Sequence, residues 1–207
     1  MPTIVDWPTT AAFKSAQFSL GLQVSEALAR GFYTGNVLSQ RSAQADRMTC
    51  VVTLPPCTRD LAGEREGYIF HLRSQRLWMR FGLPHRPIPL GTLRGTPTVT
   101  SAALAGAMSI AITTTANVTL RPGDFLGCGT NTLLMVGIPG ATANGSGAMA
   151  SCPLAMPLPV ALAGGASLAW DKPLGLWEWD GDAPQIDYTA PILQQGVALP
   201  FRQAISG

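Results

Sequence analysis

Residues 48–82 read MTCVVTLPPCTRDLAGEREGYIFHLRSQRLWMRFG, and this pattern decides the fold expected for the chain. The run 48–54 is apolar and β-branched and stops at Pro55-Pro56, which is typical of a strand that ends at prolines. Thr58 then suits an N-cap, so a helix is predicted over 58–75. A second strand is predicted at 77–82, and the three elements form a strand–helix–strand unit.

One face of the predicted helix is apolar, because residues at helical spacing line up along it. That face holds Leu61, Ala62, Tyr68, Ile69 and Leu72, and the side chains expected mostly off it are Glu64, Arg65, Glu66, Arg73 and Gln75. Gly63 and Gly67 each weaken the helix by ~1 kcal/mol relative to Ala. Being four residues apart, they also leave a flat strip for close packing.

The stretch 95–170 is almost free of charge. It spans 76 residues, and only Arg121 and Asp124 are charged. An ordinary soluble domain is about a quarter charged, and a folded domain without charges has little to keep its surface solvated. Apolar runs here are broken well before the roughly 20 residues of a membrane-spanning helix. The pattern therefore predicts a β-rich domain whose surface is largely covered by other subunits.

Short strands and turn signals fill this charge-poor stretch. Predicted strand pairs flank turns at 105–106, 129–131 and 164–165, further turns are expected at 120–124 and 144–147, and the strands are placed at 98–104, 108–114, 125–128, 132–138, 148–152, 160–163 and 166–170. Together these strands and turns predict a small Greek-key or barrel-like β-domain.

The two ends of the chain complete the predicted architecture. The N-terminal part, 1–45, shows weak strand periodicity at 18–24 and a turn at 31–36. The last segment, 173–207, has too few strands for a core of its own, so we expect it to return to the sheet of the first segment. The fold expected is mainly β: a β-sandwich-like belt domain over 1–89 with one α-helix, completed by 173–207, and a small barrel-like domain inserted at 90–172.

Composition excludes several function classes. The formal net charge of +2 gives nucleic-acid binding no electrostatic support. The first six residues lack the basic region and apolar core of a signal peptide. We therefore expect the chain to be made and used from the cytoplasm, with no membrane partner.

The segment Trp177-Glu178-Trp179-Asp180-Gly181-Asp182 has two interpretations. Aromatic faces beside carboxylates could form a sugar-binding platform. Alternatively, Trp177 and Trp179 share one face of a strand and belong to the core, with an Asp-Gly turn after them. The structural interpretation is the stronger one. Asp180, Asp182 and Asp187 could hold a cation, but the remaining ligands of a calcium loop are missing.

The other candidates for chemistry are scattered. His71 and His85 have no partner at a spacing that predicts a nucleophile–base pair. Neither Gly127-Cys-Gly129 nor Gly145-Ser-Gly147 is long enough for a phosphate loop. The cysteines lack the paired spacing of a zinc site and are interpreted as structural free thiols; they are Cys50, Cys57, Cys128 and Cys152. We expect no catalytic residue, no metal ligand and no cofactor.

The order of these pieces resembles the distal tail proteins of long-tailed (siphovirus-type) phages and related tail-tip adaptors. The resembling stretches are the strand and double proline at 48–56, the helix at 58–75, the strand at 77–82, Gly95-Thr-Pro-Thr-Val99, Ala105-Gly106-Ala107, Leu120-Arg-Pro-Gly-Asp124-Phe125 and 136–151. In that family a β-sandwich with one helix makes a belt domain, and a smaller β-domain is inserted. Neither the first 45 residues nor the stretch 153–159 follows the pattern.

The resemblance implies a structural virion protein, not an enzyme: a ring-forming adaptor, commonly a hexamer, that joins the tail tube to the tail tip. Its partners would be other copies of the chain, the tube and the tip hub, and its place the tail of a virion assembled in the host cytoplasm. The alternatives are a carbohydrate-binding module for attachment to a host surface and a small hydrolase.

Overall fold

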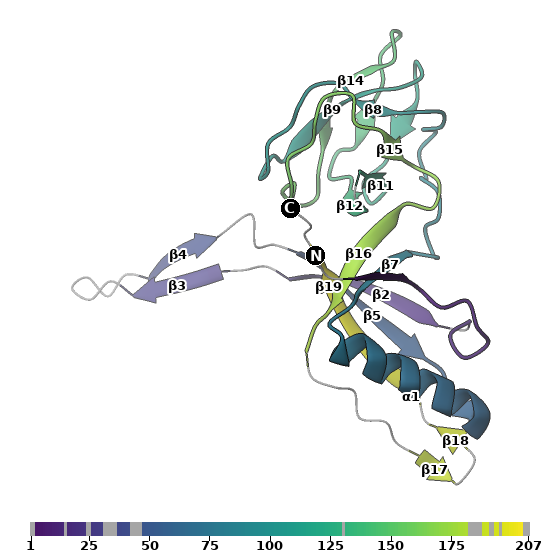
Figure 1. Cartoon of the computed structure of the whole chain (residues 1–207). Helices are drawn as coiled ribbons and strands as arrows, with labels where there is room; N and C mark the ends of the chain where they lie inside the picture. Colours follow the sequence, from purple (N-terminus) through teal and green to yellow (C-terminus); the bar gives the residue numbers. More distant parts are fainter. Residues whose placement is uncertain are drawn as a thin grey trace. The chain divides into compact units, whose positions relative to one another are not determined.

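The computed structural model describes residues 3–14, 16–23, 26–30, 37–41, 47–129, 131–181, 188–190, 193–194 and 196–204. Within them the chain is mainly β, with several small sheets and one helix (Figure 1). It divides into two compact units. The first unit comprises the described residues of 1–21, 48–85 and 174–204, and the second those of 22–47 and 86–173. Among the described helical residues no segment is long and apolar enough to cross a membrane.

The first unit is organised around a six-stranded sheet, counted over the described residues. Its order is β1 (Ile4–Asp6), β7 (Trp78–Gly82), β16 (Leu174–Trp179), β19 (Val197–Gln203), β5 (Arg47–Leu54) and β2 (Gln17–Gln23). β1 runs parallel to β7, whereas β16 is antiparallel to both β7 and β19, and β19 is antiparallel to β5. The C-terminal strands β16 and β19 thus pair with strands of the segment 48–82, as the patterning of 173–207 predicts.

Alternation along β5 fixes which face of this sheet is buried. Met48, Cys50, Val52 and Leu54 are buried, and the residues between them are half-buried or exposed. Successive side chains of a strand point to opposite faces, so one face of β5 carries the core. The buried face extends onto the neighbouring strand β19, where Phe201 lies directly opposite Cys50.

Aromatic rings fill much of this core. Trp7 contacts Phe13, Phe18 and Phe81 with ring centroids 5.7, 5.5 and 5.4 Å away, and Phe81 stacks on Trp177 at 5.1 Å and 12°. Edge-to-face and stacked geometries at these distances each add to the free energy of apolar burial. Phe13 and Phe18 come from the N-terminal segment, which therefore belongs to the core of the first unit.

The helix, α1 (Arg59–Ser74), begins directly after Thr58 as predicted, although the Thr58 side chain makes no capping hydrogen bond. Ala62, Ile69 and Leu72 are buried, which confirms the predicted apolar face, while Leu61 and Tyr68 are half-buried. Gly63 and Gly67 face open space within this chain, and no neighbouring atom lies within 4 Å of a Cβ built on either.

The prediction that Arg65 lies off the buried face is wrong. Arg65 is only 2% exposed, and its guanidinium donates hydrogen bonds to the carbonyl oxygens of Ala12, at 2.6 Å, and Pro55, at 2.5 Å. Buried charged groups are tolerated when they are hydrogen-bonded. Arg65 therefore ties the N-terminal segment and the end of β5 to α1.

The C-terminal end of α1 is a Schellman motif. Gln75 is the C-cap, and Arg76 follows in the left-handed conformation with φ +50°. The Leu77 amide donates to the Leu72 carbonyl and the Arg76 amide to the Arg73 carbonyl, which are the two bonds that define the motif. Glycine is the usual residue at the left-handed position, so Arg76 stands where the backbone favours another residue.

Further described strands form two small antiparallel sheets. β6 (Cys57–Thr58) pairs with β18 (Leu193–Gln194), which pairs with β17 (Tyr188–Ala190), and β3 (Glu26–Arg30) pairs with β4 (Val37–Arg41). The predicted turn at 31–36 lies outside the described residues.

Besides the β3–β4 pair, the second unit contains three small groups of strands among the described residues. They are β14 (Ala148–Pro153) with β9 (Ser109–Thr113) and β8 (Thr98–Val99), then β10 (Thr119–Leu120) with β13 (Ala141–Thr142), and β12 (Thr132–Met135) with β11 (Phe125–Cys128) and β15 (Leu168–Ala169). Apolar side chains from all three groups, among them Ile112, Leu120 and Leu126, form one buried cluster. Turns at 105–106, 122–123, 145–146 and 164–165 lie within the turns predicted at 105–106, 120–124, 144–147 and 164–165. The turn predicted at 129–131 includes residue 130, which lies outside the described residues.

Several predicted strands of this unit are shorter than expected because the stretch 153–162 takes over their partners. Residues 103–108 run beside it: the Ala103 amide donates to Leu162 O, the Gly106 amide to Leu158 O, and the Leu154 amide to Met108 O. The strands predicted at 98–104 and 160–163 are therefore reduced to β8 and to one isolated bridge, Ala103 with Leu162. The strand predicted at 132–138 ends at Met135.

Candidate functional site

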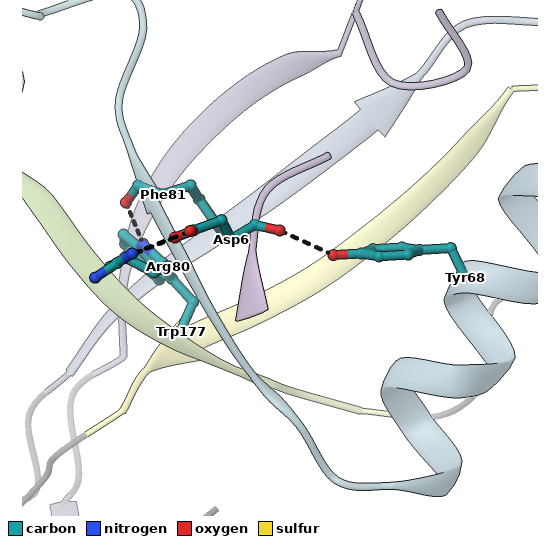
Figure 2. A network of polar contacts seen from close by, with 5 residues as sticks. All are labelled: Asp6, Tyr68, Arg80, Phe81 and Trp177. Atoms are coloured by element: carbon teal, nitrogen blue, oxygen red, sulfur yellow. Dashed lines mark hydrogen bonds and ion pairs between the residues drawn. The ribbon is translucent and has the colours of Figure 1, made fainter. Parts of the chain in front are cut away.

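The Trp177-Glu178-Trp179 segment is β16, and its two tryptophans have different surroundings. Trp177 is fully buried, stacks on Phe81, and its indole N–H donates to the Phe81 carbonyl at 3.1 Å (Figure 2). Trp179 is half-buried and meets Phe201 edge-on at 5.5 Å. The core interpretation therefore holds for Trp177, while Trp179 keeps part of its ring at the surface.

A polar network joins β1, β7 and α1 near this core. Asp6 accepts two hydrogen bonds from Arg80, at 2.6 and 3.0 Å, and its carbonyl accepts one from the Tyr68 hydroxyl at 3.2 Å (Figure 2). The hydrogen bond from Arg80 lowers the pKa of Asp6, and the same contact raises the pKa of Arg80. Burial, together with the charge of Asp6, raises the pKa of Tyr68 to about 12. The network is exposed to solvent on the Asp6 side, so it positions β1 more than it stabilises the fold.

A pocket of about 960 Å³ in the first unit lies beside the C-terminal end of α1. Helix α1 and the residues after it contribute one wall, and β7, β16 and β19 contribute the other. Three aromatic side chains line it, together with charged and polar groups; the main lining residues are Phe70, Trp78, Trp179, Arg73, Ser74, Arg76, Glu178 and Arg202. We call this pocket the α1 groove. Ligand sites commonly combine aromatic walls with a few polar groups.

The charges of the α1 groove do not balance. Arg202 donates to Glu178 at 2.8 Å and lies 3.7 Å from Asp180, so its charge is compensated. Among the described residues, Arg73 has one hydrogen-bond acceptor, the backbone oxygen of Gly181 at 3.4 Å. Arg76 is exposed and makes no ion pair with the residues that the structure describes. Within the described part of the chain, the guanidinium groups of Arg73 and Arg76 therefore have no carboxylate partner.

The other predicted candidates are not brought together. His71 lies exposed in the last turn of α1, and His85 is exposed in the loop after β7. Asp182 and Asp187 lie outside the described residues. Within the described part of the chain, no three His, Cys, Asp or Glu side chains are close enough to hold a metal ion. The prediction that the whole chain lacks a metal ligand or catalytic residue stays a prediction.

All four cysteines are buried free thiols. Burial raises the pKa of Cys50 to about 12, and burial with the charge of Asp124 does the same for Cys152. Burial also raises the pKa values of Cys57 and Cys128, and the Cys57 thiol donates to the Gln194 side-chain carbonyl at 3.2 Å. Because the thiolate is the reactive form, burial and the raised pKa values both lower the reactivity of these thiols.

Asp124 has a structural role that the sequence pattern did not reveal. It is 3% exposed, and its carboxylate accepts backbone hydrogen bonds from Leu90 at 2.7 Å, Gly91 at 3.1 Å and Arg121 at 2.7 Å. An Asp after a Pro-Gly turn is a signal for such side-chain-to-backbone bonding. Because Asp124 is buried, Arg121 is the sole exposed charged side chain of the described residues in 95–170.

The glycine pattern at 145–147 serves the turn itself. The amides of Ser146 and Ala148 donate to the Asn144 side-chain oxygen at 3.0 and 2.9 Å. These two donors are therefore already used, which agrees with the expectation that this segment is not a phosphate loop.

Comparison of the chain with protein-family models and with curated proteins gives no match.

Proposed function

We propose that the chain is a structural virion protein, a ring-forming adaptor that joins the tail tube of a long-tailed phage to the tail tip. In this proposal residues 1–89, completed by 173–207, form a β-sandwich-like belt domain, and residues 90–172 form an inserted barrel-like domain. The protein assembles in the host cytoplasm as a homo-oligomeric ring, with six copies as the expected number. It is a scaffold and not an enzyme.

The single observation that carries the proposal is the surface of the charge-poor stretch. On the described surface of 95–170, Arg121 is the one exposed charged side chain. Three large apolar side chains are exposed there: Leu104 by 78%, Met108 by 54% and Ile138 by 85%. Scattered apolar residues on a surface are normal, but a surface almost without charge is not. Depletion of charge is what distinguishes the core of a protein–protein interface.

Two of these exposed side chains belong to neighbouring segments. The Met108 carbonyl accepts from the Leu154 amide, and the Gly137 amide next to Ile138 donates to the Pro153 carbonyl, each at 2.8 Å. Residues 153–154 are therefore hydrogen-bonded to the segment of Met108 through Leu154 and to the segment of Ile138 through Pro153. Their proximity favours one continuous contact region, and stable interfaces bury about 800 Å² on each partner.

The experiment is a mass measurement on purified protein at micromolar concentration, by light scattering after size exclusion. We expect a ring-sized oligomer for the wild type and a loss of assembly for Ile138→Asp, because a buried unpaired carboxylate is strongly unfavourable. Thr9→Asp, which adds the same charge at an exposed polar site outside the charge-poor stretch, is the control. A monomeric wild type, together with monomers in assembled particles, would contradict the proposal.

A further inference from the structure

We propose that the α1 groove binds an anionic saccharide, a sugar that carries a carboxylate or a phosphate. This inference goes beyond ring formation, because it assigns a ligand to a site that an adaptor does not need. It rests on the aromatic walls, the uncompensated guanidinium groups and the backbone conformation of Arg76.

The aromatic walls suit the apolar faces of a sugar ring. Phe70 is 58% exposed on α1 and is not used by the core of the chain. Trp179 is half-buried, and its edge-on contact with Phe201 holds the indole in place. The π face of an aromatic ring carries partial negative charge and attracts the weakly positive C–H groups of a sugar.

The Glu178–Arg202 pair suits sugar hydroxyls. Its 2.8 Å ion pair places a carboxylate, which only accepts hydrogen bonds, beside a guanidinium, which only donates them. Neighbouring hydroxyls can satisfy both, since each hydroxyl donates and accepts. An acidic peptide or a nucleic-acid backbone offers mainly acceptors and would meet the carboxylates of Glu178 and Asp180. The pair therefore favours a saccharide over these two polymers.

Arg73 and Arg76 supply the positive charge for the anionic group. Neither has a carboxylate partner among the described residues, and guanidinium forks match the geometry of carboxylates and phosphates. Arg76 also occupies the left-handed position of the Schellman motif, where Gly would be favoured. A residue kept in an unfavourable backbone conformation at a groove is a signal of function.

The test uses the full chain and titration calorimetry with tetragalacturonate, mannose 6-phosphate and neutral maltotetraose. We expect one or both anionic sugars to bind at least tenfold more tightly than maltotetraose, and the stronger of the two identifies the anion. Arg76→Gly should weaken that binding at least tenfold, and Phe70→Ala severalfold. Arg59→Gly removes the same charge from the other end of α1, outside the groove, and should bind like the wild type.

Folding cannot explain a loss in Arg76→Gly, because Gly suits that backbone position better than Arg does. Its melting temperature and its oligomer mass should equal or exceed those of the wild type. Equal affinities for the anionic and neutral sugars overturn the inference. So does tighter binding of tetraglutamate or tetrathymidylate than of either anionic sugar, or an Arg76→Gly variant with unchanged affinity.

Discussion

In the second unit, the single side chain of Asp124 connects two separate backbone segments. Its carboxylate connects the segment at 90–91 to the turn at 121–124 through three backbone hydrogen bonds. Buried backbone amides need a hydrogen-bond partner, and the Asp124 carboxylate supplies it for these three.

Replacing Asp124 by Ala should therefore lower the free energy of unfolding by about 3 kcal/mol or more, because buried donors lose charge-assisted partners. Asp124→Asn should cost less, since one acceptor oxygen remains. Chemical denaturation followed by tryptophan fluorescence measures both changes. The exposed Asp171 provides the control: Asp171→Ala should change stability by less than ~0.5 kcal/mol, and equal effects at the two sites would contradict the assignment.

The thiols make a second prediction at the residue scale. In the folded chain at pH 8, Cys50 and Cys152 should not react with a disulfide reagent such as DTNB, because both are buried and the pKa of each is raised to about 12. All four thiols should react in guanidinium chloride. Rapid labelling of native protein at either residue would show that its burial is misassigned.

Sequence patterns predict the role of a residue well only when its partners are near in the sequence. The alternation of β16 placed Trp177 and Trp179 on one face, but only Trp177 became fully buried. The difference depends on Phe81, about a hundred residues away, which stacks on Trp177 alone. The α1 groove was invisible for the same reason, since its walls come from three separate stretches of the chain.

At the scale of elements, α1 gives the sharpest test of packing. Ile69 is buried, with only 1% of its surface exposed, so Ile69→Ala should destabilise the chain by ~2–5 kcal/mol. Glu64 is exposed on the opposite side, and Glu64→Ala should change stability by less than ~0.5 kcal/mol. Thermal denaturation measures both, and equal shifts in Tm would show that the face is wrong.

The end of α1 yields a prediction of opposite sign. Arg76→Gly should raise the free energy of unfolding by about 0.5–1 kcal/mol, because an L-residue with a side chain is strained at positive φ and glycine is not. Urea denaturation of the variant and the wild type measures the change. Gln75→Gly, one residue earlier at φ −91°, should destabilise instead and serves as the matched control.

Local signals predicted this helix well and failed at one position. The helix bounds and the buried positions 62, 69 and 72 follow from helical spacing and from the prolines before the helix. The Thr58 side chain makes no capping hydrogen bond, and no glycine marks the C-terminal end. Arg65 was misplaced because a charged residue is expected to face water. Its hydrogen-bond acceptors are the carbonyl oxygens of Ala12 and Pro55. A local sequence pattern cannot predict the contact with Ala12, which lies 53 residues away.

At the scale of the whole molecule, β7 and β16 explain how the chain leaves and re-enters the first unit. Gly82 and Leu174 lie directly opposite each other in an antiparallel pair, and Cα atoms of such pairs are only about 5 Å apart. The sheet itself therefore does not require the 91 residues between them, 83–173.

Replacing residues 84–173 by a short Gly-Ser-Gly link should leave a folded first unit. The link would close a β-hairpin between two strands that are already paired. Near-ultraviolet circular dichroism from the Trp177–Phe81 stack should survive, and unfolding should stay cooperative. An unfolded product would contradict the view that 90–172 is an insertion, especially if 1–90 alone proved to be folded.

The lone exposed charge of 95–170 also has a consequence for solution conditions. Dissolved salt weakens contacts between charged groups by screening them, but a surface with only Arg121 offers almost nothing to screen. Contacts made by this surface should therefore be nearly indifferent to sodium chloride. Sulfate, which favours the burial of apolar surface, should tighten them, and cooling should loosen them, because apolar burial weakens at low temperature.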